Sequence, residues 1–335
     1  MKRIHKSLVI TGLVVCMALG MTGCKGKVLD GSQSVATVGT KEMTLGEANF
    51  FLRFQQVQTE SYYESLLGEG IYGRDLYGNG TTYGDTLKSD IMSQMQEYYI
   101  LEEKAAEYGV TISDEEKAAI TEAAAKFLEA NDEDAKEQMT ADQETVERIL
   151  TLMTIRSKVV NAIYDSADVT VTEEEAAQRG FVYITVSKGS GDDALTEEEI
   201  GESKDKLAAA AQAVAGGDSM EGAATAQGLT ASNGTYGNGT GTNYATELIT
   251  ALDGLKEGEV SEVIETETAL YLAQVTTDLD KEATVSRMQT LLLNKKSEYY
   301  SELLEGWKVE YPLSVNDSVW DQVIFNRSYA LKSAE

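Results

Sequence analysis

The side chains that usually perform covalent or metal chemistry are scarce in this chain. Its 335 residues include one histidine, His5, and two cysteines, Cys16 and Cys24. A Ser-His-Asp or Cys-His mechanism needs a histidine beside its nucleophile, and zinc sites are built mostly from cysteine and histidine. His5 and Cys16 lie in a segment that we expect to be removed. We therefore expect no metal and no cofactor, and any activity must come from hydrogen bonds and aromatic surfaces.

The N-terminus has the pattern of a secretory signal. A basic start (Lys2, Arg3 and Lys6) precedes an apolar run at 8–19 and the sequence Met21-Thr22-Gly23-Cys24. The run is too short for a membrane span, and its end resembles a bacterial lipobox, whose cysteine is acylated and becomes the first mature residue. We expect a signal peptide at 1–24, lipid attachment at Cys24 and a tether at 25–34. The alternative is an ordinary signal peptide with an incidental cysteine. The location implied is the extracytoplasmic face of a bacterial cell membrane.

The composition excludes one broad class of function. The chain has 28 Lys+Arg against 56 Asp+Glu and a formal net charge of −28. Because little positive charge is present to neutralise phosphates, we expect no nucleic-acid partner. No spacing of carboxylates singles out a catalytic pair. Residues 75–85 contain some of the acids of a calcium loop but lack its alternating acids and its final glutamate.

The elements that must position any site are marked by repeated helix starts. Capping boxes, in which a hydroxyl and a glutamate three residues later satisfy the first amides of a helix, fit Thr44/Glu47, Ser113/Glu116, Thr172/Glu175 and Thr196/Glu199. Together with the apolar spacing, they predict helices at 45–67, 85–108, 113–131, 142–165, 196–215 and 283–307. A strand pair is expected at 35–38 and 42–44, and a long glycine-rich loop at 68–84.

The segment 248–275 has the most specific pattern. It predicts a helix that ends at Leu255, a polar turn with Gly258, an extended stretch at 260–265 and a strand at 269–275. Upstream we expect a strand at 180–187, a short helix at 218–227 and a Gly/Asn/Thr loop at 232–243.

The sequence of residues 248–275 and the order of their expected helix, turn and strand resemble the C-terminal half of a parvulin-type peptidyl-prolyl isomerase domain. Residues 98–116 resemble a step in the N-terminal chaperone domain of PrsA- and SurA-type foldases, and residues 35–47 are similar to that family's opening hairpin. The resemblance covers most of the chain after the signal.

The resemblance implies an α+β fold. A helical SurA/PrsA-like chaperone domain would be discontinuous, formed by residues 35–178 together with a C-terminal helix and tail at 277–335. A small parvulin-like domain, an antiparallel sheet flanked by helices, would be inserted at 179–276.

The resemblance also implies site residues. Matching residue by residue places Tyr183 and Tyr271 where the family has its two histidines, and offers Asn233 for the family's central Asp or Cys. Tyr244 and Leu248 fall near the residues that line the family's proline pocket. Two tyrosines could replace the histidine network as a hydrogen-bonded pair, or they could simply pack across a sheet. Because both histidines are replaced, the resemblance implies an isomerase whose activity is weak or lost.

The function implied is a membrane-anchored folding factor that acts on unfolded or newly secreted polypeptides. Phe51, Phe54 and Tyr63 on the N-terminal helices are candidates for a client groove, although the same residues suit a helix core. Two alternatives stay open: an active isomerase that uses its tyrosines, and a substrate-binding lipoprotein of a transporter. The latter needs two α/β lobes with repeated βαβ units. A homodimer through the N-terminal helices is implied by the resemblance alone.

Overall fold

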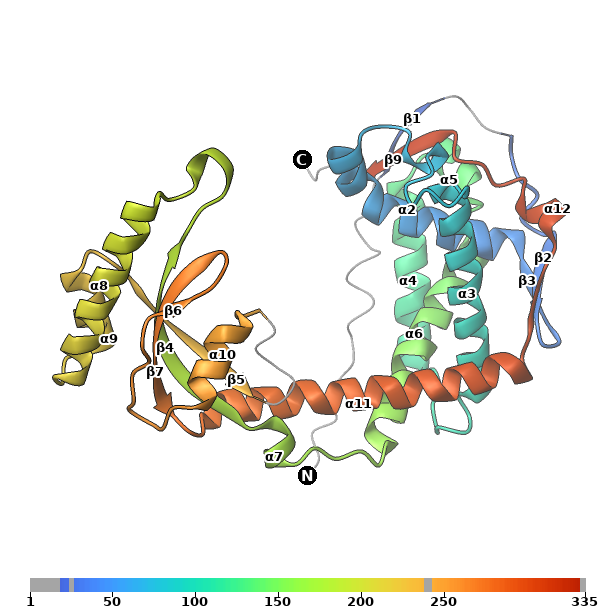
Figure 1. The fold of residues 1–335 in the computed structure, drawn as a ribbon. Helices are drawn as coiled ribbons and strands as arrows, with labels where there is room; N and C mark the ends of the chain where they lie inside the picture. Colours follow the sequence, from blue (N-terminus) through green and yellow to red (C-terminus); the bar gives the residue numbers. More distant parts are fainter. Residues whose placement is uncertain (1–18, 24–26, 238–242, 332–335) are drawn as a thin grey trace. The chain divides into compact units, whose positions relative to one another are not determined.

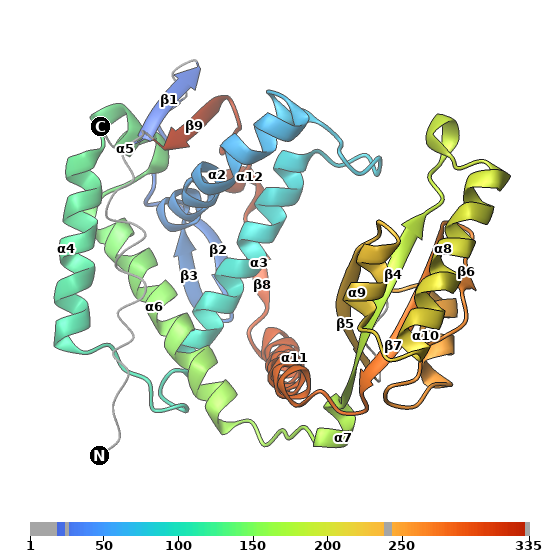
Figure 2. The ribbon, with the colours of Figure 1, turned by 90° about the vertical axis from the view of Figure 1, so that its left-hand side faces the viewer.

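The computed structural model describes residues 19–23, 27–237 and 243–331 and divides into two compact units (Figures 1 and 2). Unit 1 comprises the described residues of Met1–Ala167 and Glu298–Glu335, and unit 2 those of Asp168–Ser297. The fold is α+β, with long helices and small antiparallel sheets, as the sequence predicts. Within the described residues, no helix combines the length and the apolar character that crossing a bilayer requires.

Unit 1 is mainly helical, and its elements come from both ends of the chain. They are β1 (Leu19–Gly23), β2 (Ser34–Val38), β3 (Lys41–Thr44), α2 (Leu45–Leu67), η1 (Ile71–Gly73), α3 (Tyr83–Lys104), α4 (Asp114–Ala130), α5 (Glu133–Met139), α6 (Gln143–Ser166), the second part of α11 (Lys281–Glu310), β8 (Leu313–Val315), α12 (Asp317–Trp320) and β9 (Arg327–Leu331).

Helix α2 is the central helix of unit 1. Its start is fixed by a capping box, in which the Thr44 amide donates to Glu47 Oε2 at 2.8 Å and the Glu47 amide donates to Thr44 Oγ1 at 3.2 Å. The helix contacts α3, α5 and α6, and nearly every side chain of its first three turns is buried. This part of the helix is covered on all sides, so that even its polar side chains Asn49, Arg53 and Gln56 are buried, and they form hydrogen bonds inside the unit.

The C-terminal part of the chain completes unit 1. Strand β8 pairs with β2, so that the sheet order is β3-β2-β8, and Leu313 lies opposite Val38. Trp320 and Val323 are buried in the same core. The helical unit is therefore discontinuous, with residues from beyond the insert supplying a strand and core side chains.

Unit 2 is a four-stranded antiparallel sheet with helices on both faces. Its elements are α7 (Glu173–Ala176), β4 (Gln178–Ser187), η2 (Gly191–Asp193), α8 (Glu197–Ala215), α9 (Met220–Ala226), β5 (Ala231–Gly237), α10 (Thr246–Asp253), β6 (Ile264–Glu265), β7 (Ala269–Thr277) and the first part of α11. The sheet order is β5-β4-β7-β6. The unit is longer than the predicted insert at 179–276 because it includes α7 and the beginning of α11.

The two faces of the sheet carry separate apolar clusters, because successive side chains of a strand point in opposite directions. Val182 and Ile184 of β4 pack against α8 and α9 on one face. Phe181 lies on the opposite face with Leu248 and Leu252 of α10. Figure 1 shows α8 and α9 on one side of the strands and α10 on the other.

Most of the expected elements are present. All four predicted capping boxes form, and the predicted helices and strands lie within a few residues of the observed ones. The prediction of a loop at 232–243 is wrong for its first part, because residues 231–237 pair with β4 as β5. The glycine-rich stretch at 68–84 contains η1, whose Ile71 and Tyr72 are buried. Helix α5 was not expected.

Candidate functional site

Aromatic side chains gather on the α10 face of the sheet in unit 2. We call Phe181, Tyr183, Tyr236, Tyr244 and Tyr271 the aromatic face. The Tyr183 ring lies 5.9 Å from that of Tyr244, nearly perpendicular to it, and 6.5 Å from that of Tyr271. Phe181 contacts Tyr183, Tyr236 and Tyr244 at centroid distances of 5.4, 5.7 and 5.1 Å. Tyr183, Tyr244 and Tyr271 are each partly exposed, so the cluster has a fixed base and an accessible rim.

The strand register explains how residues far apart in the sequence meet. In the pairing of β4 with β7, Phe181 lies opposite Val275, Tyr183 opposite Ala273 and Thr185 opposite Tyr271. Directly opposed residues of antiparallel strands share a face. The small Ala273 between the tyrosines lets their rings approach each other over the strand.

Gly234 of β5 makes room for this packing. A β-carbon at this position would lie 2.5 Å from Phe181 Cζ and 2.7 Å from the Tyr244 hydroxyl oxygen. The absence of a side chain therefore allows both rings to pass over the β5 backbone. Burial raises the pKa of Tyr244, and the neighbouring Tyr183 adds to the rise. The Tyr244 hydroxyl is accordingly neutral at physiological pH and can donate or accept a hydrogen bond.

Arg179 holds α10 in place beside the aromatic face. Its Nη1 donates to the Tyr236 hydroxyl at 2.7 Å and to the Leu252 carbonyl at 2.9 Å, and its Nη2 donates to the Leu255 carbonyl at 2.7 Å and to Asp278 Oδ1 at 2.7 Å. A cation at the C-terminal end of a helix satisfies the last carbonyls and interacts favourably with the helix dipole. Arg179 thus joins β4, β5, α10 and the turn after β7.

The residues predicted from the sequence divide into two groups in unit 2. Tyr183, Tyr271 and Tyr244 do come together. Asn233 does not: it lies opposite Val182 in the β4–β5 register, and its exposed side chain is on the α8/α9 face of the sheet. The expectation that Asn233 shares a site with the tyrosines is therefore wrong. Leu248 of α10 is fully buried against the sheet, so it supports the cluster from inside and offers no surface to a substrate.

Sequence reasoning missed Phe181, Tyr236, Gly234 and Arg179. The alternation of β4 carried the signal for Phe181, because residues two apart on a strand share a face. Gly234 and Tyr236 fall in the stretch that the sequence predicted as a loop, where composition gives no indication of pairing. The role of Arg179 depends on where α10 ends in space and has no sequence signal.

In unit 1 the predicted client residues are mostly core. Phe51 packs against Tyr98 with ring centroids 5.2 Å apart, and Phe54 lies against Phe50. Both are buried, which corrects their expected role in a client groove: no ligand reaches them while α2 is folded. Tyr63 is only partly buried, and its part in client binding stays a prediction.

Tyr63 belongs to a row of rings at the end of α2 that the sequence did not predict. We call Tyr62, Tyr63, Tyr83, Tyr72 and Phe325 the aromatic row. Successive centroids lie 5.5, 5.7, 5.5 and 4.5 Å apart, and the last pair stacks with an interplanar angle of 7°. Burial raises the pKa of Tyr83 to about 12, with Tyr63 contributing next. Tyr62 at one end is 64% exposed, so the row runs from the surface into the unit.

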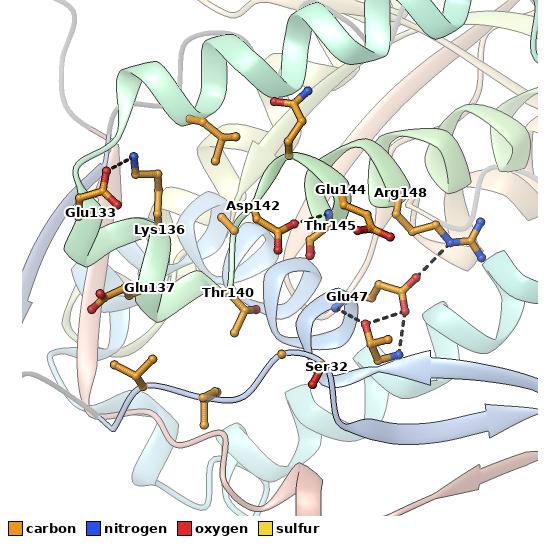
Figure 3. A pocket seen from close by; sticks show the side chains of 17 residues that line it. Ser32, Glu47, Glu133, Lys136, Glu137, Thr140, Asp142, Glu144, Thr145 and Arg148 are labelled. Carbon is orange, nitrogen blue, oxygen red and sulfur yellow. Dashed lines mark hydrogen bonds and ion pairs between the residues drawn. The ribbon is translucent and has the colours of Figure 1, made fainter.

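A separate cavity of about 870 Å³ lies in unit 1, between the segment before β2 and helices α4, α5 and α6 (Figure 3). Four of the charged groups that line it form two ion pairs. Lys136 pairs with Glu133 at 2.5 Å, and Glu47 accepts from the Arg148 Nε at 3.1 Å while it caps α2. Because these groups serve the fold, the cavity offers less to a ligand than the aromatic face does.

Two further expectations concern other parts of the chain. Cys24, the predicted lipid attachment, lies outside the described residues. In the stretch that partly resembles a calcium loop, the Asp75 carboxylate accepts the backbone amides of Tyr77, Asn79 and Gly80. That carboxylate therefore organises the loop itself.

Comparison with known proteins gives matches only among solved structures: no family model and no curated protein matches the chain. The foldase PrsA of Lactococcus lactis is 14% identical, with 88% of this chain and 100% of that chain covered and a TM-score of 0.36. The foldase PrsA of Streptococcus pneumoniae is 16% identical, with 76% and 100% covered and a TM-score of 0.31. A SurA-like chaperone of Campylobacter jejuni is 10% identical, with 84% and 98% covered and a TM-score of 0.30. At these identities the likeness is one of fold alone.

Proposed function

We propose that this chain is an extracytoplasmic folding factor that binds non-native polypeptides, anchored to the membrane through Cys24. The observation that carries the proposal is the aromatic face of unit 2, where three partly exposed tyrosines are held on a rigid sheet. The sequence resemblance to PrsA- and SurA-type foldases supports the same role. Lipid attachment rests on the lipobox-like sequence before Cys24.

The aromatic face suits weak binding of many sequences. Tyrosine rings give apolar contact area at low conformational cost, and their hydroxyls reach backbone groups of an extended chain. Each ring contact contributes about 0.5–1.5 kcal/mol beyond the area it buries. Three such contacts add at most about 4.5 kcal/mol, and association costs about 4–15 kcal/mol in lost freedom of motion, so the affinity for any one client is weak. A folding factor that must release its client needs contacts of this strength.

Prolyl isomerase activity, if retained, would be weak. The barrier to rotation about the peptide bond is about 18–20 kcal/mol, and a catalyst must bind the twisted amide better than the planar one. Tyr183, Tyr244 and Tyr271 can pack against a proline ring and offer hydroxyl groups to the amide. Each tenfold acceleration requires about 1.4 kcal/mol of preference for the twisted form, and one or two hydrogen bonds supply that much.

The transporter alternative receives no support from the described strands. Every pair of strands described here is antiparallel, whereas βαβ units form parallel sheets. Dimerisation through the N-terminal helices stays a prediction of the resemblance.

The isomerase test measures cis/trans exchange of Xaa-Pro peptides by NMR with residues 25–335. The double variant Tyr183→Phe/Tyr271→Phe keeps both rings and removes both hydroxyls, and Tyr77→Phe, at a tyrosine 67% exposed in the 68–84 stretch, is the matched control. Acceleration that only the double variant loses identifies an isomerase. Peptide binding without acceleration leaves the face as a binding site. A folded chain that neither binds nor accelerates contradicts the proposed site.

The folding-factor and anchoring parts of the proposal have separate tests. The same chain is expected to suppress aggregation of a denatured client at near-equimolar ratio, and failure to do so contradicts the folding role. In a bacterial host, labelled palmitate is expected to enter the wild-type protein and not Cys24→Ala. Equal labelling of both proteins would exclude Cys24 as the attachment site.

A further inference from the structure

The C-terminal strand of unit 1 pairs with a segment that processing would remove. Strand β1 (Leu19–Gly23) and strand β9 (Arg327–Leu331) form a two-stranded antiparallel sheet in which all five residues of each strand are in register, from Leu19 opposite Leu331 to Gly23 opposite Arg327 (Figure 1). Residues 19–23 belong to the predicted signal peptide. Cleavage before Cys24 therefore takes away the only strand that pairs with β9 among the described residues.

Strand β9 is held in place by contacts that do not involve β1. It lies along α2. Just before it, Arg53 Nη2 donates to the Ile324 carbonyl at 2.8 Å, and the Phe325 ring stacks on Tyr72. Val323 is buried in the core. Because the approach to β9 is fixed in this way, removal of β1 leaves a strand in position with an unpaired edge of N–H and C=O groups.

We propose that this edge is a strand-addition site, and that its occupant in the processed protein is an extended segment of a non-native polypeptide. The inference rests on the proposed folding function and on processing at Cys24. In the described structure the chain's own segment 19–23 occupies the edge as a client would. Backbone pairing requires no particular client sequence, which suits a protein that receives many unfolded chains.

The aromatic row includes a residue that is close to β9 in the sequence. Phe325, its last ring, lies two residues before the start of β9, and Tyr62 at the other end is exposed. A client strand on β9 would therefore gain main-chain hydrogen bonds from the edge and apolar contacts from the row. This assigns to unit 1 a second client site, independent of the aromatic face in unit 2.

The first experiment measures amide hydrogen exchange at 327–331 in residues 25–335, which lack β1 and represent the processed chain without its lipidated Cys24. The probes are a blocked peptide of residues 17–23 (Met-Ala-Leu-Gly-Met-Thr-Gly) and reduced, carboxymethylated α-lactalbumin, an unfolded protein. We expect either probe at saturation to slow exchange at alternate residues of β9 at least tenfold, because alternate amides of a strand face the same edge. Binding of the probes without protection at 327–331 overturns the inference.

Two neighbouring proline substitutions give a matched control. Proline cannot donate a hydrogen bond, and of two successive residues only one donates to the added strand. Of Ser328→Pro and Tyr329→Pro, one is therefore expected to weaken probe binding about fivefold and the other to leave it within about twofold. The full chain, in which β1 fills the edge, is expected to bind the peptide more weakly than residues 25–335. Equal affinity of all these forms overturns the inference.

The same samples separate this inference from the proposed function. If the processed chain suppresses client aggregation while 327–331 stay unprotected, strand addition is wrong and the folding role stands. If the chain neither binds nor protects any client, the proposed function fails. If protection at 327–331 rises with protein concentration in the absence of a probe, and sedimentation shows dimers, the occupant is a second copy of the chain and the client assignment is overturned.

Discussion

Replacing Gly234 by alanine tests the geometry of the aromatic face with a single methyl group. The added β-carbon would lie 2.5 Å from Phe181 Cζ and 2.7 Å from the Tyr244 hydroxyl oxygen. Tyr244 can swing away because it is partly exposed, whereas Phe181 is 1% exposed and enclosed by packed neighbours. The clash with Phe181 must therefore shift the β5 backbone. Overpacking of this kind costs about 1–3 kcal/mol.

A second glycine of the same unit provides the control. Gly201 lies in α8, and a β-carbon there would meet no atom within 4 Å. Alanine is favoured over glycine within a helix by about 0.5–1 kcal/mol. The same chemical change should thus destabilise unit 2 at Gly234 and stabilise it at Gly201.

The assay must report on unit 2 alone, because a two-unit chain need not unfold in one step. Trp307 and Trp320 both lie in unit 1, so tryptophan fluorescence follows that unit only. Hydrogen exchange in peptides from β4 and β7, measured across a urea series, follows unit 2. A lower urea midpoint for Gly234→Ala and a higher one for Gly201→Ala are expected, with the fluorescence transition unchanged. A midpoint for Gly234→Ala equal to that of wild type would refute the packing described for Phe181 and Tyr244.

Three further predictions follow from polar contacts in unit 2. Arg179→Met is expected to cost about 2 kcal/mol and to raise exchange first in α10; exchange rising equally through the unit would contradict a local anchor. The pKa of Glu175 is lowered to about 2, first by the hydrogen bond from Lys295, so its stabilising effect is present above about pH 4.5 and is lost as the pH falls toward 2. Glu175→Gln should therefore flatten the dependence of unfolding free energy on pH between 4.5 and 2. An unchanged pH dependence would exclude a stabilising role for this carboxylate. Thr196→Ala removes the cap that Glu199 completes and is expected to cost about 1 kcal/mol in α8, measured by urea unfolding against Ser203→Ala.

Local signals predicted the elements well, because they act over a few residues. Each capping box needs only a hydroxyl and a glutamate three positions later, and the start of α2 at Thr44 and of α8 at Thr196 followed directly. Strand β5 was not predicted because its Gly/Asn-rich sequence has a weak strand propensity, and it becomes a strand through its pairing with β4. Tertiary context overrides weak strand propensity in such a case.

The site was predictable only in part. Tyr183 and Tyr271 were identified through a resemblance, and the register of β4 with β7 decides that they meet. Asn233 lies on the other face of the sheet because it is paired with Val182. This placement can be predicted only when the pairing of β5 with β4 is known. Phe51 and Phe54 are candidates for a surface in the sequence because α2 is rich in aromatic residues. The burial of the first three turns of α2 depends on α3, α5 and α6 around it.

In the sequence, unit 2 lies between the two parts of unit 1, and this order decides which unit can fold first. All the strands of unit 2 lie within one continuous stretch of chain, so this unit can close its sheet soon after residue 277 has emerged during synthesis. Unit 1 cannot complete its fold at that stage. Strand β2 pairs with β8, and the core includes Trp320, and both β8 and Trp320 are made later. Until then its early helices carry unsatisfied apolar surface for the time needed to make more than a third of the chain. The protein must therefore pass through a stage in which one unit is native while the other still needs protection from aggregation.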